Sequence, residues 1–239
     1  MKFKSLIKLS SLALILGITI QTFSQSQKSK VMDNTKNENI GLLVIMKAKQ
    51  GKEQAVKEFL LGGLSLVNAE PKTESWFAFQ IDEQTFGIYD TFEAEEGRQA
   101  HLTGEVAKAL LANAGDLLEG FDASKDIKTV DVQASNHKAG NQNNGLLVIM
   151  KAKEGKTSAV EEFLQAGKSL VSAEPATLSW YAFKINEETY AIFDTFADDA
   201  GRDTHLTGKV AAALMENAPV ILEGFEASAI QKINILASK

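Results

Sequence analysis

The chain has 239 residues, of which 44% are hydrophobic and 23% are charged, a composition typical of a soluble globular protein. Its net charge is −6 and it shows no basic cluster, so its charge pattern argues against a nucleic-acid partner. It contains no cysteine, which excludes disulfides, thiol chemistry, and cysteine-ligated zinc or iron–sulfur sites.

The first 24 residues have the pattern of a secretory signal peptide. Three lysines precede an apolar run from Leu9 to Ile20, and small polar residues follow this run. The run is shorter than a membrane span of about 20 residues, although an uncleaved anchor is the alternative. We expect cleavage near Ser24, a periplasmic or secreted protein, and no stable membrane insertion after cleavage. Removing three of the 25 basic residues would leave 22 against 31 acidic residues, a net charge of −9.

An internal duplication organises the rest of the chain. The segment GLLVIMKAK at 41–49 returns at 145–153, and LEGF at 118–121 returns at 222–225, always at an offset of 104. This period is too long for a solenoid repeat, so each copy should be a domain. A tandem repeat of one module of about 100 residues is therefore expected.

Polar stretches mark the boundaries of these modules. We expect a flexible spacer at 25–40, a first module at 41–134, a linker at 135–144 and a second module at 145–239. His137 lies in the expected linker and has no counterpart, so we expect it to be solvated.

The first module shows the order β-α-β-β-α-β. Its expected elements, in chain order, are a strand at 41–48, an amphipathic helix at 51–70, two hairpin strands at 75–81 and 85–92, a helical region at 94–121 that is broken near Gly104, and a short strand at 126–132. Pairing in the hairpin is expected to place Trp76 opposite Thr91 and Ala78 opposite Tyr89. This order predicts an α+β fold of the ferredoxin-like type.

The strands are apolar on both faces. A ferredoxin-like sheet has helices on one face only, and the other face would be polar if it met water. The runs LLVIM and WFAF are apolar at both odd and even positions, which point to opposite faces of the sheet, so both faces require burial. We therefore expect the sheets of the two modules to cover each other as an α/β barrel, which makes the chain an internal pseudo-dimer; a higher oligomer is also compatible with the sequence.

Both modules resemble the antibiotic-biosynthesis-monooxygenase-like family of the dimeric α/β-barrel group. The resemblance rests on KAKxGKxxAVxEFL, AEPxTxSW, the aromatic hairpin and DTFxxxxGRxxHLTGxVAxAL, which occur in both copies. It implies two ferredoxin-like sheets packed into a barrel, with a pocket between sheet and helices. The enzymes that give the family its name oxidise anthrone- or quinol-like aromatic compounds with O₂, without a bound metal or flavin, so the resemblance implies no cofactor.

The most distinctive repeated motif is GRQAHLTG, which returns as GRDTHLTG. It holds the only two arginines of the chain, Arg98 and Arg202, and two of its three histidines, His101 and His205. On a helix, residues three apart share one face. Cofactor-free oxygenation needs a base that forms a substrate anion and a cation that stabilises it. We therefore expect the histidines to act as bases and the arginines to bind the developing oxyanion.

A structural role for the same motif is the alternative. Glu95 precedes Arg98 by three residues and Asp199 precedes Arg202 by three, so each arginine can form an ion pair within its own helix. His101 can stitch the helix break that precedes LTG. A duplication copies a structural motif as faithfully as a catalytic one, so the repeat alone does not decide between the two roles.

The tryptophans and two aspartates in the strands complete the candidate site. We expect Trp76 and Trp180 to form an aromatic wall that binds the substrate, with core packing as the alternative. Asp90 and Asp194 lie inside apolar strands, where a carboxylate needs a partner. That partner is either His101, which would form an Asp–His dyad, or a backbone amide.

Two classes of function remain open. The first is a cofactor-independent monooxygenase that acts on a small aromatic or quinol-like compound and O₂. The second is a non-catalytic periplasmic module that binds or protects a small molecule in the same pocket. The sequence has one histidine per module and no cysteine, so we expect no metal site.

Overall fold

The computed structural model describes residues 38–239. The expected signal peptide at 1–24, its cleavage site, and most of the expected spacer at 25–40 lie outside the described residues. Among the described helices, none is long and apolar enough to cross a membrane.

The first module has the expected β-α-β-β-α-β order, with two additional short helices. Its elements are β1 (Ile40–Lys47), α1 (Glu53–Val67), β2 (Ser75–Gln80), β3 (Thr85–Phe92), α2 (Glu95–Leu102), α3 (Glu105–Leu117), α4 (Ala123–Asp126) and β4 (Ile127–His137). The turn before α1 contains Gly51 at a φ of 80°, a backbone conformation that glycine adopts without steric cost. The expected break in the second helical region falls between α2 and α3, at Gly104.

The second module repeats this order. Its elements are β5 (Asn144–Lys151), α5 (Thr157–Ser172), β6 (Thr177–Lys184), β7 (Thr189–Phe196), α6 (Asp199–Leu206), α7 (Lys209–Ile221), the 3₁₀ turn η1 (Ala227–Ala229) and β8 (Ile230–Ser238). Strand β4 continues to His137 and β5 begins at Asn144, so six residues, 138–143, connect the two modules.

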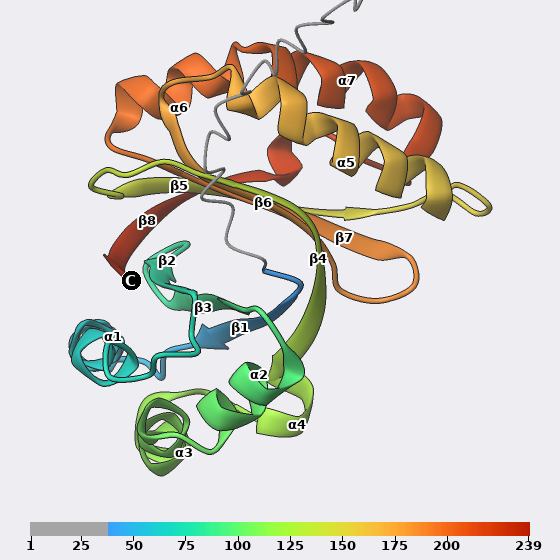
Figure 1. Ribbon diagram of the computed structural model, residues 1–239. Coiled ribbons are helices and arrows are strands. Elements are labelled where there is room, and N and C mark those ends of the chain that lie inside the picture. The colour runs from blue at the N-terminus through green and yellow to red at the C-terminus, as the bar shows by residue number, and fades with distance from the viewer. Residues whose placement is uncertain (1–37) are drawn as a thin grey trace, which may run out of the picture. The chain divides into compact units, whose positions relative to one another are not determined.

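The eight strands of residues 38–239 form one closed antiparallel barrel, in the order β1-β3-β2-β8-β5-β7-β6-β4. The two modules close it through their last strands: β4, which pairs with β1, also pairs with β6, and β8, which pairs with β5, also pairs with β2. Figure 1 shows α1, α2, α3 and α4 on one side of the sheets and α5, α6 and α7 on the other. The expected α+β fold, with two ferredoxin-like modules paired as a barrel, is confirmed.

The apolar side chains form three separate clusters. One lies inside the barrel and contains Phe77, Tyr89 and Phe183, together with other aromatic and aliphatic residues of both modules. The other two lie between each sheet and its own helices, with Trp76 in the first module and Trp180 in the second. Both faces of each sheet are therefore buried, which explains why odd and even positions of the strands are both apolar.

The register of the β2–β3 hairpin differs from the expected one by one residue. Trp76 pairs with Asp90 instead of Thr91, and Ala78 pairs with Ile88 instead of Tyr89. Residues opposite each other in a sheet point to the same face. The observed register therefore places Tyr89 inside the barrel and Asp90 on the helix-covered face with Trp76.

The expectation that His137 is solvated is wrong. Its Nε2 bonds to the carboxylate of Glu38, and its ring lies 4.8 Å from that of Tyr181. Glu38 is 4% exposed and also accepts hydrogen bonds from Ser75 (2.7 Å) and Thr91 (2.6 Å). Sequence reasoning missed this contact because the two partners are 99 residues apart.

The second module has an uncharged version of the same arrangement. Gln142, which lies 104 residues after Glu38, is half-buried and accepts hydrogen bonds from Ser179 and Thr195. Within residues 38–239, the side chain of Gln142 has no hydrogen bond to a histidine. The two halves of the barrel interior thus differ, with an acid–histidine pair in one and an amide in the other.

This asymmetry predicts how substitutions at the pair behave. His137→Gln should lower the free energy of unfolding at pH 7 by about 2 kcal/mol, because it removes the histidine hydrogen bond to the buried Glu38 carboxylate. Adding Glu38→Gln should restore part of that loss, because the neutral arrangement at Gln142 is already compatible with the fold. Urea unfolding of the two variants measures this, and a double variant no more stable than His137→Gln would contradict it.

Candidate functional site

The histidine of the repeated motif links three elements of the first module. His101, on α2, is 6% exposed, and its Nδ1 lies 2.6 Å from the carboxylate of Glu70 in the turn after α1. Its Nε2 lies 3.1 Å from the carboxylate of Asp90 on β3. Thr73 also donates to Glu70 (2.9 Å). We call this set of Glu70, His101 and Asp90 the histidine bridge.

The second module contains the same bridge. His205 Nδ1 lies 2.6 Å from Glu174, and its Nε2 lies 3.4 Å from Asp194. The second carboxylate oxygen of Glu174 accepts from the backbone N–H of Val210 (3.5 Å), in the first turn of α7. The bridge therefore holds the turn after the first long helix, a central strand and the break between two helices together.

The two carboxylates favour the protonated form of each histidine. Burial alone lowers the pKa of His101, but the charge of Asp90 and hydrogen bonds to Asp90 and Glu70 outweigh it and raise this pKa from 6.5 to about 10. In the second module, Asp194 and Glu174 outweigh burial in the same way and raise the pKa of His205 to about 9. Both histidines thus carry a proton at neutral pH, with both ring nitrogens bound to carboxylates.

The two arginines form ion pairs within their own helices. Arg98 binds Glu95, with a distance of 2.8 Å from Nε to the carboxylate, and donates to Thr129 on β4 (2.9 Å). Arg202 binds Asp199 and donates to the backbone carbonyl of Ile233 on β8 (3.4 Å). Each arginine therefore ties a short helix to the last strand of its module.

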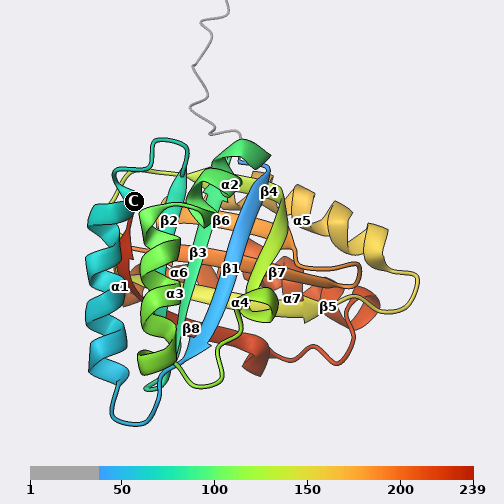
Figure 2. The ribbon, with the colours of Figure 1, turned by 90° about the horizontal axis from the view of Figure 1, so that it is seen from below.

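A pocket opens between α1, α3 and the sheet of the first module. It has a volume of about 310 Å³, within the range of small-molecule sites. Trp76 and Ile88 of the sheet form its floor, and apolar residues of both helices form its walls. Figure 2 shows α1 and α3 side by side across the strands of this module. Glu58 and Asn113 are the polar side chains that line it.

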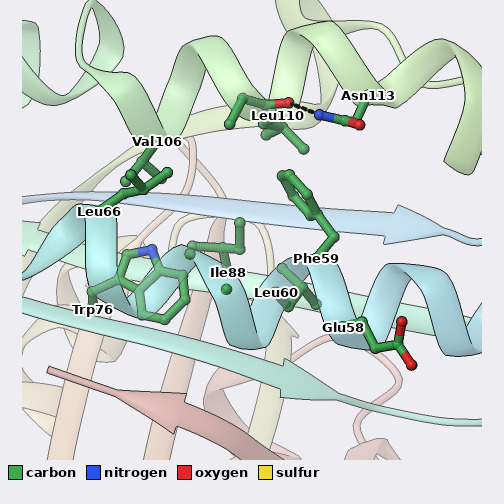
Figure 3. Close-up of a pocket in the computed structure, with 12 residues that line it drawn as sticks. Glu58, Phe59, Leu60, Leu66, Trp76, Ile88, Val106, Leu110 and Asn113 are labelled. Atoms are coloured by element: carbon green, nitrogen blue, oxygen red, sulfur yellow. Dashed lines mark hydrogen bonds between the residues drawn. The ribbon is translucent and has the colours of Figure 1, made fainter.

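The indole of Trp76 supplies the only polar atom at the floor of this described pocket. Trp76 is 1% exposed, and its Nε1 has no hydrogen-bond partner among residues 38–239. One edge of its six-membered ring faces Gly63 of α1, where a Cβ would lie 3.4 Å from it. In Figure 3 the nitrogen lies on the edge of the ring that faces α3. A buried N–H without an acceptor is costly and is uncommon in native proteins.

The second module has a pocket of about 470 Å³ between α5 and α7, and its lining comes from these two helices. Glu162 and Asn217 line it at the positions equivalent to Glu58 and Asn113. Trp180 lies beneath Gly167, which lines the pocket, and its Nε1 also has no hydrogen-bond partner in the described part of the chain.

The sequence-predicted site residues do not form one site. The structure brings His101 together with Asp90 and places Trp76 in the pocket between α1 and α3. His101 lines a different hollow of about 480 Å³, between the turn after α1 and the start of α3, together with Lys72 and Lys108. Leu66 contributes to both hollows.

Sequence reasoning missed Glu58 and Asn113. Both recur at the 104-residue offset, as Glu162 and Asn217, so a signal was present. Polar residues on an amphipathic helix usually face solvent, however, and nothing in the sequence marks these two as pocket residues. Within residues 38–239, no group of three or more histidine or acidic side chains is arranged to hold a metal ion.

Comparison with solved structures identifies the fold. The chain is similar to a presumed monooxygenase from Fusobacterium nucleatum, with a TM-score of 0.73 and 16% identity over 86% of this chain and 95% of that one. An anthrone oxidase-like protein matches with a TM-score of 0.55 and 9% identity over 85% of this chain and 93% of that one. A protein of unknown function from Nitrosomonas europaea is 41% identical over 44% of this chain and all of that one, with a TM-score of 0.41.

No protein-family model matches the sequence, and no curated protein matches it. The structural matches, with the closed eight-stranded barrel, show that the chain has the fold of the antibiotic-biosynthesis-monooxygenase-like proteins. Here that barrel is built from two tandem modules of one chain.

The histidine bridge predicts a loss of stability at alkaline pH. A raised pKa in the folded state stabilises the protein below the unfolded pKa of 6.5, and this contribution disappears as pH rises through about 9 to 10. The free energy of unfolding should therefore fall between pH 7 and pH 10. Urea titrations across this range measure the fall.

The matched control for this prediction is His101→Gln/His205→Gln. Glutamine keeps a donor but does not titrate, so the variant should be less stable at pH 7 and should lose most of the alkaline fall. A double variant with the wild-type pH slope would show that the bridges are not its source.

Proposed function

We propose that each module binds a small planar aromatic compound that carries an acceptor oxygen, in the pocket between its two long helices and its sheet. The observation that carries this proposal is the Trp76 Nε1–H, a buried donor without a partner among the described residues, at the floor of a pocket with a mostly apolar lining. The same donor recurs at Trp180.

The chemistry of the pocket selects this class of ligand. An indole N–H donates a hydrogen bond but cannot accept one, so the deep end of the ligand needs an acceptor such as a carbonyl or phenolate oxygen. A ring system bound in the pocket would pack against apolar side chains, among them Phe59, Ile88 and Leu110. A ligand with both features would remove the cost of the unpaired donor.

Oxygenation is the second candidate function, and the resemblance to an anthrone oxidase-like protein favours it. An anthrone or hydroquinone anion can reduce O₂ itself. An N–H at the floor would stabilise the anion's oxygen as a preorganised donor. His101 and His205 are protonated and both ring nitrogens of each bind carboxylates, so we assign these histidines a structural role. In this candidate reaction the substrate would release its own proton to solvent.

Removing the indole donor tests the binding proposal. Trp76→Phe/Trp180→Phe should raise the Kd for anthrone about five- to tenfold, because it removes one hydrogen bond while keeping an aromatic floor. Calorimetric titration of the full chain measures this. The control, His101→Gln/His205→Gln, should bind anthrone as the wild type does at a temperature where it is folded. Equal binding by wild type and the tryptophan variant would overturn the proposal.

Oxygen uptake tests the second candidate with the same variants. With a panel of anthrones and hydroquinones, wild type should consume O₂ above the rate of autoxidation and the tryptophan double variant should lose most of that excess. Loss in the folded histidine variant alone would place the chemistry at the histidine bridge instead. No excess uptake by wild type would leave a binding protein without this activity.

A further inference from the structure

The two ends of the pocket differ in polarity. Figure 3 shows Trp76 at one end and Glu58 and Asn113 at the other, with Ile88 and Leu60 between them. The floor offers a hydrogen-bond donor. Glu58 and Asn113, at the opposite end, supply the polar groups next to the outer end of a bound ligand.

The outer end carries a carboxylate and a side-chain amide. One N–H of the Asn113 amide donates to the backbone carbonyl of Ala109 (2.8 Å), which leaves its Oδ1 as an acceptor and its second N–H as a donor. Glu58 is exposed and accepts one hydrogen bond from Gln54 (2.9 Å), and its second carboxylate oxygen has no partner among residues 38–239. An ionised carboxylate is an acceptor only.

The second module preserves this polarity. Asn217 donates to the backbone carbonyl of Ala213 (2.8 Å), and Glu162 is exposed. The lining residues described for the two pockets include no lysine, arginine or histidine. Both mouths therefore present one negative charge and one side-chain amide, without a cation in the lining.

We propose that the pocket selects a neutral or cationic aromatic ketone or phenol whose outer end carries a hydroxyl or ammonium donor, and that it discriminates against aromatic carboxylates. The proposal rests on the proposed function and specifies its ligand. Glu58 and Glu162 are its specificity-determining residues. They attract an ammonium group and repel a carboxylate at the same position.

The chain carries its own reporter for this test. Its two tryptophans are Trp76 and Trp180, one beside each pocket, so Trp180→Phe leaves Trp76 as the single fluorescent tryptophan. The probes are three acetonaphthones that bear a hydroxyl, an aminomethyl or a carboxylate group at the end opposite the ketone. Quenching of Trp76 fluorescence measures the Kd of each probe in 50 mM salt.

In the Trp180→Phe chain, the carboxylate probe should bind about tenfold more weakly than the aminomethyl probe, because it exchanges attraction for repulsion at a partly solvated charge. Adding Glu58→Gln should reduce that ratio to about twofold. Glu83→Gln is the matched control: it removes one exposed acidic charge in the β2–β3 turn, away from the pocket lining, and should leave the ratio unchanged.

Other outcomes separate this proposal from the one on which it rests. Equal Kd values for the carboxylate and aminomethyl probes, or a ratio that Glu58→Gln leaves at tenfold, would overturn the specificity while leaving an aromatic-binding pocket. A ratio reduced equally by Glu83→Gln would show that net charge, rather than Glu58, is responsible, and would also overturn it. No quenching by any probe would overturn both proposals.

Discussion

The pairing of each module's last strand with the sheet of the other module is the constraint on which the rest of the structure depends. Because β4 pairs with β6 and β8 pairs with β2, each module completes the sheet of the other and the barrel closes without an exposed edge. The closed barrel buries the large aromatic side chains of its interior. Separating the modules would expose these side chains and four strand edges, so the modules are expected to unfold cooperatively.

The barrel interior is filled, so ligand-sized space lies outside it, between each sheet and its helices. The histidine bridge stabilises that layer, since it ties the turn after α1 to β3 and to the end of α2. Its residues lie outside the lining of the pocket between α1 and α3. The repeated GRxxHLTG motif thus holds the fold together, while Trp76 and the residues at the mouth line the pocket itself.

Much of the architecture could be predicted from local sequence patterns. The 104-residue repeat, the strand and helix periodicities and the apolar character of both strand faces were sufficient for two ferredoxin-like modules in one barrel. The hairpin register could not be predicted, because shifting it by one residue keeps the same apolar pattern and only exchanges faces, as Tyr89 and Asp90 show. The contact of His137 with Glu38, and the pairing of His101 at both nitrogens, depend on partners brought together by the fold from distant positions.

The difference between Glu38 and Gln142 shows that the two halves of this barrel can carry different side chains at equivalent positions. In a symmetric homodimer every substitution is made twice, so a carboxylate at this position would appear in both halves of the shared interior. A fused chain is free of that restriction, and here one half carries an acid–histidine pair and the other an amide. The same freedom extends to the two pockets: joined halves can acquire separate ligands while sharing one barrel.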